Sequence, residues 1–336
     1  MSQSTPRPTV MADVARRAGV SVMTVSRVLN RFPGVSDVTR RRVERAVDAL
    51  GYQANTAARV LAGGRSHTLG VIAVESEQFG PSHVLFAIEA AAREAGHRLA
   101  LVTVSSREDI DSVLGHLRTS HVDGVIAVAP VKPLVEAVTV AAKHLPLVVA
   151  GGDPTLGTPT VSIGQEQGGY LATKHLLELG HGTVHHVRGP KDWIDATGRR
   201  RGWSDALKDF RAPRPAVLTG DWGAKSGYAA GERLALDPDV TAIFAANDQM
   251  ALGVMRALHD AGRRVPDDVS VVGFDDTPES GYFSPSLTTI RQNFADLGQR
   301  CVSLVLSLVE GDSLEEHPVV PPELILRESS GSVRRR

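Results

Sequence analysis

The sequence predicts an α/β protein in which a small helical head precedes a larger body of alternating strands and helices. Residues 9–30 have the pattern of two short helices joined by a glycine turn, and from Thr68 onward short apolar runs alternate with amphipathic stretches. Charge separates the two parts. Residues 1–65 contain eleven arginines, no lysine and four acidic residues, a net charge of +7, whereas the whole chain of 336 residues carries −1.

The head begins with the segment TVMADVARRAGVSVMTVSRVLN. Thr9 is expected to cap a first helix from about Met11 to Ala18, and Gly19 to end it, because glycine turns there at no steric cost. Ser21 is expected to cap a second helix, with Thr24 at its third position. Such a pair matches a helix-turn-helix, which places its second helix in the major groove of DNA. Four valines form the apolar seam: Val14, Val20, Val25 and Val28.

An αα-hairpin inside a larger core would show the same apolar pattern. The charge favours DNA, because a basic head on an acidic body is typical of proteins whose head meets phosphate. Ser36 is expected to cap a third helix over residues 37–51 with one apolar face. That face comprises Val43, Ala46, Val47 and Leu50. The arginines of this helix either contact phosphate or form a solvated surface; they are Arg40, Arg41, Arg42 and Arg45.

Composition limits the class of protein. With 42% hydrophobic residues the chain can bury sizeable cores, and its length suggests two or three domains. A single cysteine, Cys301, excludes a disulfide framework and favours a reducing compartment. The first ten residues lack the apolar region of a signal peptide, and no uncharged apolar run of about 18 residues is found. We therefore expect a cytoplasmic, nucleoid-associated protein with no membrane partner.

Motifs of enzymes are absent from the sequence. It contains no GxxxxGK[ST], HExxH, GxSxG or CxxC pattern, so we expect neither an enzyme nor a cofactor. Twelve histidines raise the question of a metal site, above all His181 and the pair His185 and His186. They lack a partner at helical spacing with an identifiable third ligand, so surface or strand histidines are the better interpretation and no metal is expected.

The segment between head and body is short and has the composition of a single short helix. Residues 55–64, NTAARVLAGG, combine a capping asparagine, good helix formers and a glycine stop. A helix of this length is marginal in water, so it needs a partner or DNA to be ordered. A plain linker is the alternative.

The body repeats one rhythm twice. Strands are expected at residues 68–74, 98–104, 123–129 and 146–151, and again at 183–189, 216–218, 241–247 and 269–276. Helices are expected near residues 82–96, 107–119, 132–143, 167–180, 196–210, 224–236 and 249–262. This βαβ texture predicts parallel sheets. Two such halves predict two lobes with a cleft between them, and ligands of these sheets sit beyond the carboxyl ends of the strands.

Several segments together make the chain resemble one family. They are DVARRAGVSVMTVSRVLN in the head, NTAARVLAGG after it, and ANDQMALG, DDVSVVGFDDT and SLTTIRQNFADLG in the body. In this order and at this spacing they resemble the LacI/GalR family of bacterial transcriptional repressors over essentially the whole chain. The lactose-repressor branch looks most similar, because Trp222 and Phe294 fall where that branch keeps sugar-contacting aromatics.

The resemblance implies a domain organisation. A helix-turn-helix head would span residues 1–54, a hinge helix 55–65, and an effector-binding body with the type I periplasmic-binding-protein fold 66–336. The N-lobe of the body would comprise about residues 66–164 and 293–320, and the C-lobe about 165–292 and 321–332. Because the chain ends at SVRRR, without the leucine-heptad tail that tetramerises one family member, a homodimer is expected.

In the head, the family's recognition-helix readers fall on Val22, Met23 and Arg27, and arginine reading guanine is the commonest specific contact. Val22 and Met23 are apolar where the lactose-repressor branch has polar readers, which implies a different operator. The hinge leucine that the family inserts into the minor groove matches Leu61. The expected DNA contacts are Thr9, Ser21, Val22, Met23, Thr24, Ser26, Arg27, Asn30, Asn55, Arg59 and Leu61.

In the body, Arg199 matches the family's effector-clamping arginine, whose fork suits vicinal hydroxyls or a carboxylate. Asn247 and Asp275 resemble its hydroxyl-binding pair, although Asp276 is an equal claimant by chemistry and Asp275 could instead cap a turn. Trp222 could stack on a sugar ring or simply pack. The expected effector contacts are Pro81, Ser82, Asp153, Trp193, Arg199, Trp222, Asn247, Asp275, Gln292 and Phe294.

One departure from the branch bears on the ligand. Gly151 stands where the lactose-repressor branch has an acidic sugar contact, and Asp153 is the expected substitute after a small shift of the loop. The identity of the effector is therefore open.

The function implied is a sequence-specific DNA-binding regulator of transcription. The leading hypothesis is a repressor of sugar-utilisation genes that a mono- or disaccharide inducer releases from a palindromic operator. A corepressor-dependent regulator of the same fold is the alternative. A sugar-binding transport protein shares the body fold, but the basic head and the missing signal peptide disfavour it.

Overall fold

The computed structural model describes residues 9–29, 32–52, 65–74, 78–104, 109–129, 131–142, 145–151, 157–312 and 318–333. By its internal contacts the chain divides into two units, Met1–Ser66 and His67–Arg336. Some residues with an expected contact lie outside the described ranges: Asn30, Asn55, Arg59, Leu61 and Asp153. Within those ranges, no helix is long and apolar enough to cross a membrane.

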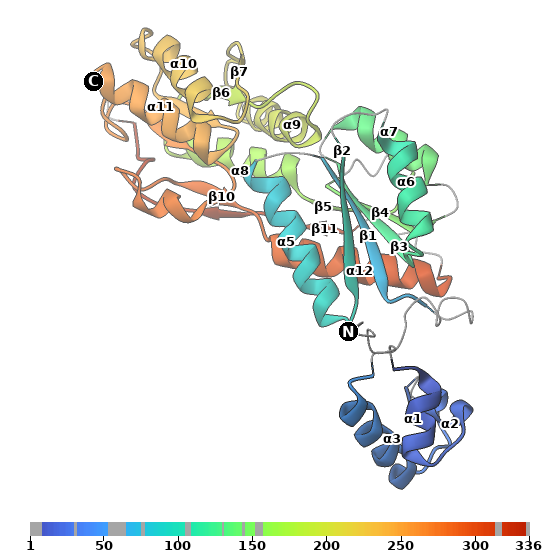
Figure 1. Cartoon of the computed structure of the whole chain (residues 1–336). Coiled ribbons are helices and arrows are strands. Elements are labelled where there is room, and N and C mark those ends of the chain that lie inside the picture. Colours follow the sequence, from blue (N-terminus) through green and yellow to red (C-terminus); the bar gives the residue numbers. More distant parts are fainter. Residues whose placement is uncertain are drawn as a thin grey trace, which may run out of the picture. The chain divides into compact units, whose positions relative to one another are not determined.

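The first unit is built from three helices, α1 (Met11–Ala18), α2 (Val22–Leu29) and α3 (Asp37–Leu50) (Figure 1). The predicted signals at their ends are confirmed. Gly19 ends α1 with a φ of 61°, and the Ser21 hydroxyl accepts a hydrogen bond from the Thr24 amide at 3.1 Å. The helices share one small core, which includes Val14, Ala18, Val25, Val28, Val43 and Ala46.

The predicted capping role of Thr9 is wrong. Val10 occupies the capping position of α1, and the Asp13 carboxylate accepts a hydrogen bond from its amide at 3.1 Å. The acid in the first turn therefore satisfies that amide, and it also suits the positive end of the helix dipole. The Thr9 hydroxyl instead donates to the Leu50 carbonyl at 3.4 Å, which links the start of α1 to the end of α3.

The second unit contains two lobes. In the N-lobe, one sheet has the order β11-β5-β4-β3-β1-β2, with every pair parallel. Its strands are β1 (Thr68–Val74), β2 (Arg98–Val104), β3 (Gly124–Val128), β4 (Leu147–Ala150), β5 (Thr160–Ile163) and β11 (Val319–Val320). Its helices are α5 (Phe79–Glu94), α6 (Ile110–Thr119), α7 (Lys132–Ala141) and α12 (Phe294–Glu310).

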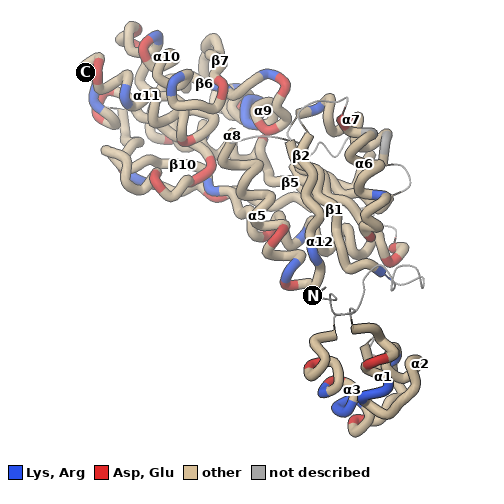
Figure 2. Tube along the Cα trace, in the orientation of Figure 1, with Lys and Arg blue, Asp and Glu red and all other residues tan. Residues whose placement is uncertain are grey.

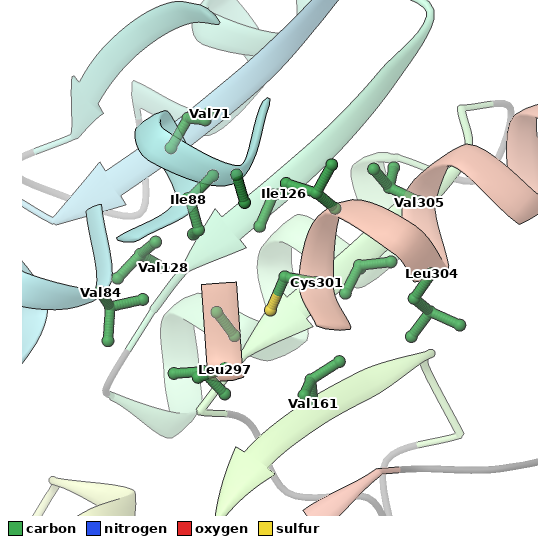
Figure 3. Packing of buried hydrophobic residues seen from close by; sticks show 14 of the residues in the cluster. Val71, Val84, Ile88, Ile126, Val128, Val161, Leu297, Cys301, Leu304 and Val305 are labelled. Atoms are coloured by element: carbon green, nitrogen blue, oxygen red, sulfur yellow. The ribbon is translucent and has the colours of Figure 1, made fainter. Parts of the chain in front are cut away.

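Helices cover both faces of this sheet, which explains its continuous apolar strands. Side chains alternate along each strand, so Ile126 and Val128 of β3 pack with α5 and α12, whereas Val125 and Ala127 pack with α6 and α7. Figure 3 shows the first of these cores, where Cys301 and its neighbours on α12 meet the strands. Cys301 is free and fully buried in this core.

The C-lobe repeats the arrangement with a parallel sheet of order β7-β6-β8-β9. Its strands are β6 (His185–Arg188), β7 (Leu218–Thr219), β8 (Ala242–Ala245) and β9 (Ser270–Val272). Its helices are α8 (Gln165–Glu178), α9 (Ile194–Asp209), α10 (Ala224–Ala235), α11 (Asp248–Asp260) and the 3₁₀ helix Pro278–Tyr282. An antiparallel pair, β10 (Thr289–Arg291) and β12 (Glu323–Ile325), completes the lobe. The chain passes between lobes after β5, after β10 and after β11.

Most of the expected elements occur. Strands β1 and β2 have their predicted bounds, and the other predicted strands are shorter than expected. The expected helix at 82–96 begins earlier, at Phe79, because Pro81 fits the first turn of a helix, where its missing amide proton is not needed. Helix α12, strands β5 and β11 and the antiparallel pair were not predicted. The four strands span only two to four residues each, too few to show a period in the sequence.

Glycines allow the helices of the C-lobe to approach closely. A Cβ atom on Gly169 of α8 would overlap the Arg199 carbonyl, and one on Gly202 of α9 would overlap the Glu166 carbonyl. The same reciprocal relation holds between Gly227 of α10 and Gly253 of α11. Only residues without a side chain fit at these four positions, and the approach of α8 to α9 fixes the backbone of Arg199.

We expect Gly202→Ala to destabilise the C-lobe by about 1–3 kcal/mol, because the added methyl group must push α8 and α9 apart. The exposed Gly182 has no atom within 4 Å of its Cβ direction and serves as the control. Gly182→Ala should change stability by less than about 1 kcal/mol. Urea denaturation followed by tryptophan fluorescence measures both, since all three tryptophans lie in this lobe. Equal stabilities of the two variants would contradict the close packing.

Candidate functional site

Side chains from both lobes line two adjoining pockets beyond the carboxyl ends of the parallel strands. The two pockets share Gly80, Pro81 and Asp195, so together they form one cleft. The first is completed by Val84, Val128, Ala150, Gly151, Ile163, Gln165, Gln292, Phe294 and Leu297. The second is completed by Gln78, Phe79, Trp193, Arg199, Trp222, Asn247 and Asp275.

Four polar side chains form a closed ring in this cleft. The Arg199 Nε donates to Gln165 Oε1 at 2.8 Å, and Gln165 Nε2 donates to Gln292 Oε1 at 2.8 Å. Gln292 Nε2 donates to Asp275 Oδ1 at 2.7 Å, and the same oxygen lies 3.4 Å from Arg199 Nη2. Arg199 also donates through Nη1 to the Ala246 carbonyl. The ring joins α8, α9, the end of β9 and the crossover before α12.

The acids of this region are shifted toward the neutral form. Burial raises the pKa of Asp275 to about 7, although the charge of Arg199 opposes the shift and those of Asp248 and Asp195 add to it. Burial likewise raises the pKa of Asp248 to about 6 against three hydrogen bonds to its carboxylate. Those bonds come from the Ser280 and Thr289 hydroxyls and the Thr277 amide.

Asp275 and Asp276 have different partners. Both have positive φ angles, 109° and 56°, which turn adjacent side chains in different directions. Asp275 lines the cleft, whereas Asp276 accepts hydrogen bonds from Arg291 at 2.7 Å and from Arg327 at 2.6 Å. Asp276 is thereby held within the lobe, and Asp275 is the one of the two whose side chain lines the cleft.

Asn247 and the two tryptophans form one wall. Asn247 caps α11 by accepting from the Met250 amide at 3.0 Å, and its Nδ2 donates to the Trp222 carbonyl at 3.0 Å. Trp222 has a φ of 75° and is 5% exposed, with its ring edge toward Trp193 at a centroid distance of 5.3 Å. The indole nitrogen of Trp222 is buried and has no hydrogen-bond partner among the described residues. Burial leaves Trp222 little surface for stacking on a sugar.

The other expected contacts divide between the cleft and its surroundings. Pro81 and Phe294 line the cleft, and Phe294 meets Phe79 edge-on with a centroid distance of 6.0 Å. The Ser82 hydroxyl donates to the Gln78 carbonyl at 3.0 Å, and Ser82 is not among the residues that line either pocket.

Three polar residues of the cleft were missed in the sequence, Gln78, Gln165 and Asp195, and the reason is clear for the last two. Gln165 follows β5, a strand that was not predicted, so its place beyond a strand end was hidden. Asp195 lies in the first turn of α9, behind a loop, where an acid ordinarily indicates only a favourable helix dipole. Both residues follow a strand of a parallel sheet, Gln165 after β5 and Asp195 after β6. The rule that ligands sit beyond the carboxyl ends of such strands could therefore have indicated them.

The histidines that raised a metal site have other partners. His181 shares hydrogen bonds with the hydroxyls of Thr241 and Ser270, and His186 stacks on Phe244 at a centroid distance of 4.7 Å. In the described part of the chain, no group of three His, Cys, Asp or Glu residues is placed to hold a metal ion.

The head presents a basic surface around its second helix. Val22 is 47% exposed and Met23 70% exposed, so these apolar side chains point away from the small core. Arg27 is exposed on the same helix, and arginines colour α1 and α3 blue in Figure 2. Ser21 and Thr24 share a hydrogen bond of 2.9 Å at the start of the helix, and Ser26 is half-buried. The exposed arginines outside α2 include Arg16, Arg17, Arg41, Arg42 and Arg45.

Comparison with known proteins gives the same two parts. Residues 10–55 match the family described as bacterial regulatory proteins, lacI family, and residues 173–330 match the periplasmic binding protein-like domain. The chain is 35% identical over 328 residues to the lactose operon repressor of Escherichia coli K12, covering 96% of this chain and 91% of the relative. This chain belongs to the lacI family.

Solved structures of family members have the same fold. The lac repressor dimer bound to operator and the anti-inducer ONPF matches with a TM-score of 0.87 and 35% identity, covering 97% of this chain and all of that one. A complex of the transcriptional regulator CelR with cellobiose matches with a TM-score of 0.71 and 33% identity over 96% of this chain and all of that one. The expected resemblance and the α/β fold class are thus confirmed.

The raised pKa of Asp275 predicts how stability of this lacI-family chain depends on pH. Folding favours the protonated carboxyl, so its contribution is present below about pH 4 and is lost as pH rises through about 7. Between about pH 5.5 and 8.5 the free energy of unfolding of the ligand-free protein should fall by on the order of 1 kcal/mol or more. In Asp275→Asn it should fall by less.

Thermal denaturation across this pH range measures the difference. Asp268, whose pKa is lowered to about 2 chiefly by its hydrogen bonds to Arg264, titrates outside the range, so Asp268→Asn is the control and should keep the wild-type slope. A slope that Asp275→Asn leaves unchanged would show that this carboxyl is not the titrating group.

Proposed function

We propose that this chain is a homodimeric, sequence-specific DNA-binding repressor that a mono- or disaccharide releases from a palindromic operator. The observation that carries the proposal is the pairing of an exposed basic helix-turn-helix with a cleft lined by forked donors, carboxylate and aromatic side chains. It acts by binding DNA and ligand, with no catalytic step, and works in the cytoplasm at the nucleoid.

The chemistry of the cleft supports a sugar as the effector. Arg199, Gln292, Asn247 and Asp275 together offer donors and acceptors within a few ångströms of one another, which suits a polyhydroxylated ligand. Phe294 and Trp193 add apolar ring surface beside them. Similar chains in this family have been solved with cellobiose and with the anti-inducer ONPF.

In the head, Val22, Met23 and Arg27 would meet base edges, and the hydroxyls of Ser21 and Thr24 would position the helix on phosphate. Residues 55–65 would form the hinge, with Leu61 entering the minor groove when two copies pair on the operator. A ligand that changes the relative placement of the lobes would then change hinge pairing. Thermodynamic linkage requires the operator to alter ligand affinity by the same factor.

Alanine substitutions of two arginines in the head should affect DNA binding in different ways. We expect Arg27→Ala to lose roughly 1–3 kcal/mol of discrimination between operator and random duplex, because a base contact is removed. Arg41→Ala should weaken binding to both duplexes equally and reduce the log–log salt slope by about 1, because only a phosphate contact is lost. Gel-shift titrations from 50 to 200 mM salt measure both effects. An unchanged specificity ratio for Arg27→Ala would refute the assignment of α2 as the reading helix.

We expect the effector to be a sugar that both stabilises the protein and releases it from the operator. Mono- and disaccharides are screened for thermal stabilisation and then for loss of the gel shift. With the best sugar, Asp275→Ala should bind at least about fivefold more weakly, since a buried hydrogen-bonded group is worth about 1–3 kcal/mol. Asp260→Asn, at the exposed far end of α11, is the control and should bind like wild type. A palindromic operator bound as a monomer, or bound regardless of every sugar, would contradict the proposal.

A further inference from the structure

Asp195 is the one acid of the cleft whose side chain is uncommitted among the described residues. It is the second residue of α9, is half-buried, and lines both pockets of the cleft. It makes no side-chain hydrogen bond or ion pair with any described residue, not even with the amides at the start of its own helix. Two carboxylate oxygens therefore face the cleft with their acceptor capacity unused.

The neighbouring polar groups are already paired with one another. Arg199 is bound by Gln165, the Ala246 carbonyl and Asp275, and Gln292 uses both ends of its amide in the ring. Asn247 likewise uses its oxygen at the helix start and its nitrogen at the Trp222 carbonyl. Among the described residues of the cleft, Asp275 has only its Oδ1 bonded, and Asp195 alone has its whole carboxylate available to a new donor.

Acids outnumber cations among the described residues that line the cleft. Asp195 and Asp275 line it beside one cation, Arg199, and the charge of Asp195 adds to the raised pKa of Asp275. Burial raises the pKa of Asp195 too, against the pull of Arg199, even though the start of a helix ordinarily stabilises a carboxylate. A carboxylate that is partly removed from water is stabilised by a positive partner, and no described cation forms an ion pair with Asp195.

Aromatic rings stand beside the unpaired acid. Trp193, two residues before Asp195, and Trp222 line the same pocket in an edge-to-face pair. An ammonium group is attracted by the faces of such rings and forms its strongest hydrogen bonds with carboxylates. Neutral hydroxyls could bond to Asp195 as well, but they would leave its charge unbalanced.

We propose that Asp195 makes the cleft specific for a sugar that carries a protonated amino group. This inference rests on the proposed function and narrows its ligand class from sugars in general to amino sugars. In the complex, the ammonium donates to the Asp195 carboxylate beside Trp193, and the remaining hydroxyls bond to the residues of the ring. Asp195 thus distinguishes amino sugars from neutral sugars, whereas Arg199 and Asp275 bind the hydroxyl groups that both kinds of sugar carry.

Matched pairs of sugars test the proposal. Glucose, galactose and mannose are each compared with their 2-amino-2-deoxy counterparts, and glucose also with its 3-amino and 6-amino derivatives, by calorimetry and operator release at neutral pH. The N-acetylated 2-amino sugars are the uncharged controls. We expect at least one amino sugar to bind tenfold or more tightly than both its parent sugar and its N-acetyl form.

Two variants assign that preference to a residue. Asp195→Asn keeps the size of the side chain and should reduce the preference to near onefold while leaving operator binding intact. Asp192→Asn, an exposed acid three residues earlier that lines neither cleft pocket, should keep the full preference. A preference that survives in Asp195→Asn would overturn the assignment.

The remaining outcomes separate this inference from the proposed function. If the neutral sugars bind and release the operator as well as every amino sugar does, the inference is wrong and the sugar-responsive repressor stands. If N-acetyl forms bind as tightly as free amines, shape rather than charge selects the ligand and the inference is again wrong. If no sugar of either kind binds while the operator is bound specifically, both the inference and the sugar part of the proposed function fail.

Discussion

The buried guanidinium of Arg199 is the group on which the cleft depends. Its side chain is only 4% exposed, so its charge and donors must be satisfied by protein atoms. The guanidinium donates hydrogen bonds to Gln165 on α8 and to the carbonyl of Ala246 after β8, and it forms an ion pair with Asp275 after β9. The ring of Phe274 lies beneath it, with the guanidinium carbon 3.7 Å from the ring centroid. One cation thus fixes the mutual positions of three loops beyond the strand ends.

Close helix packing supplies the geometry for that cation. Because Gly169 and Gly202 have no side chains, α8 and α9 approach until their backbones touch. The carbonyl of Arg199 lies within this contact, so the backbone that carries the guanidinium cannot shift without separating two helices. The same packing sets Asp195 at one end of α9 and Gln165 at the facing end of α8. The polar chemistry of the cleft therefore depends on residues with no polar atoms beyond the backbone.

The parts of the molecule that the sequence predicted are those with strong local signals. The glycine turn at Gly19, the serine cap at Ser21 and the continuous apolar runs of the buried strands are each visible within a few neighbouring residues of the chain. The cap at Thr9 failed because the capping position of α1 falls on Val10, one residue later, and the Thr9 hydroxyl donates to the Leu50 carbonyl instead. Strand β5 and the pair β10–β12 exist only through partners far away in the chain, so nothing local revealed them.

The same limit applies to the cleft. Arg199, Asn247 and Asp275 could be placed because they sit in motifs beside predicted strands, and their burial and mutual bonds follow from the topology. The absence of a partner for Asp195 could not be foreseen, since it depends on where every neighbouring donor is already engaged. The choice between Asp275 and Asp276 likewise required the positions of Arg291 and Arg327, which come from β10 and from beyond β12.

The late position of α12 in the chain has a consequence for synthesis on the ribosome. The strands β1 to β5 are complete at Ile163, but the helix that covers one face of their sheet begins only at Phe294, and the edge strand β11 follows at Val319. At about 5–20 residues per second, translation leaves that face incompletely covered for on the order of ten seconds. A nascent N-lobe therefore exposes apolar surface that is prone to aggregation throughout synthesis of the C-lobe. In a chain that is terminated early, this surface stays accessible to chaperones and proteases.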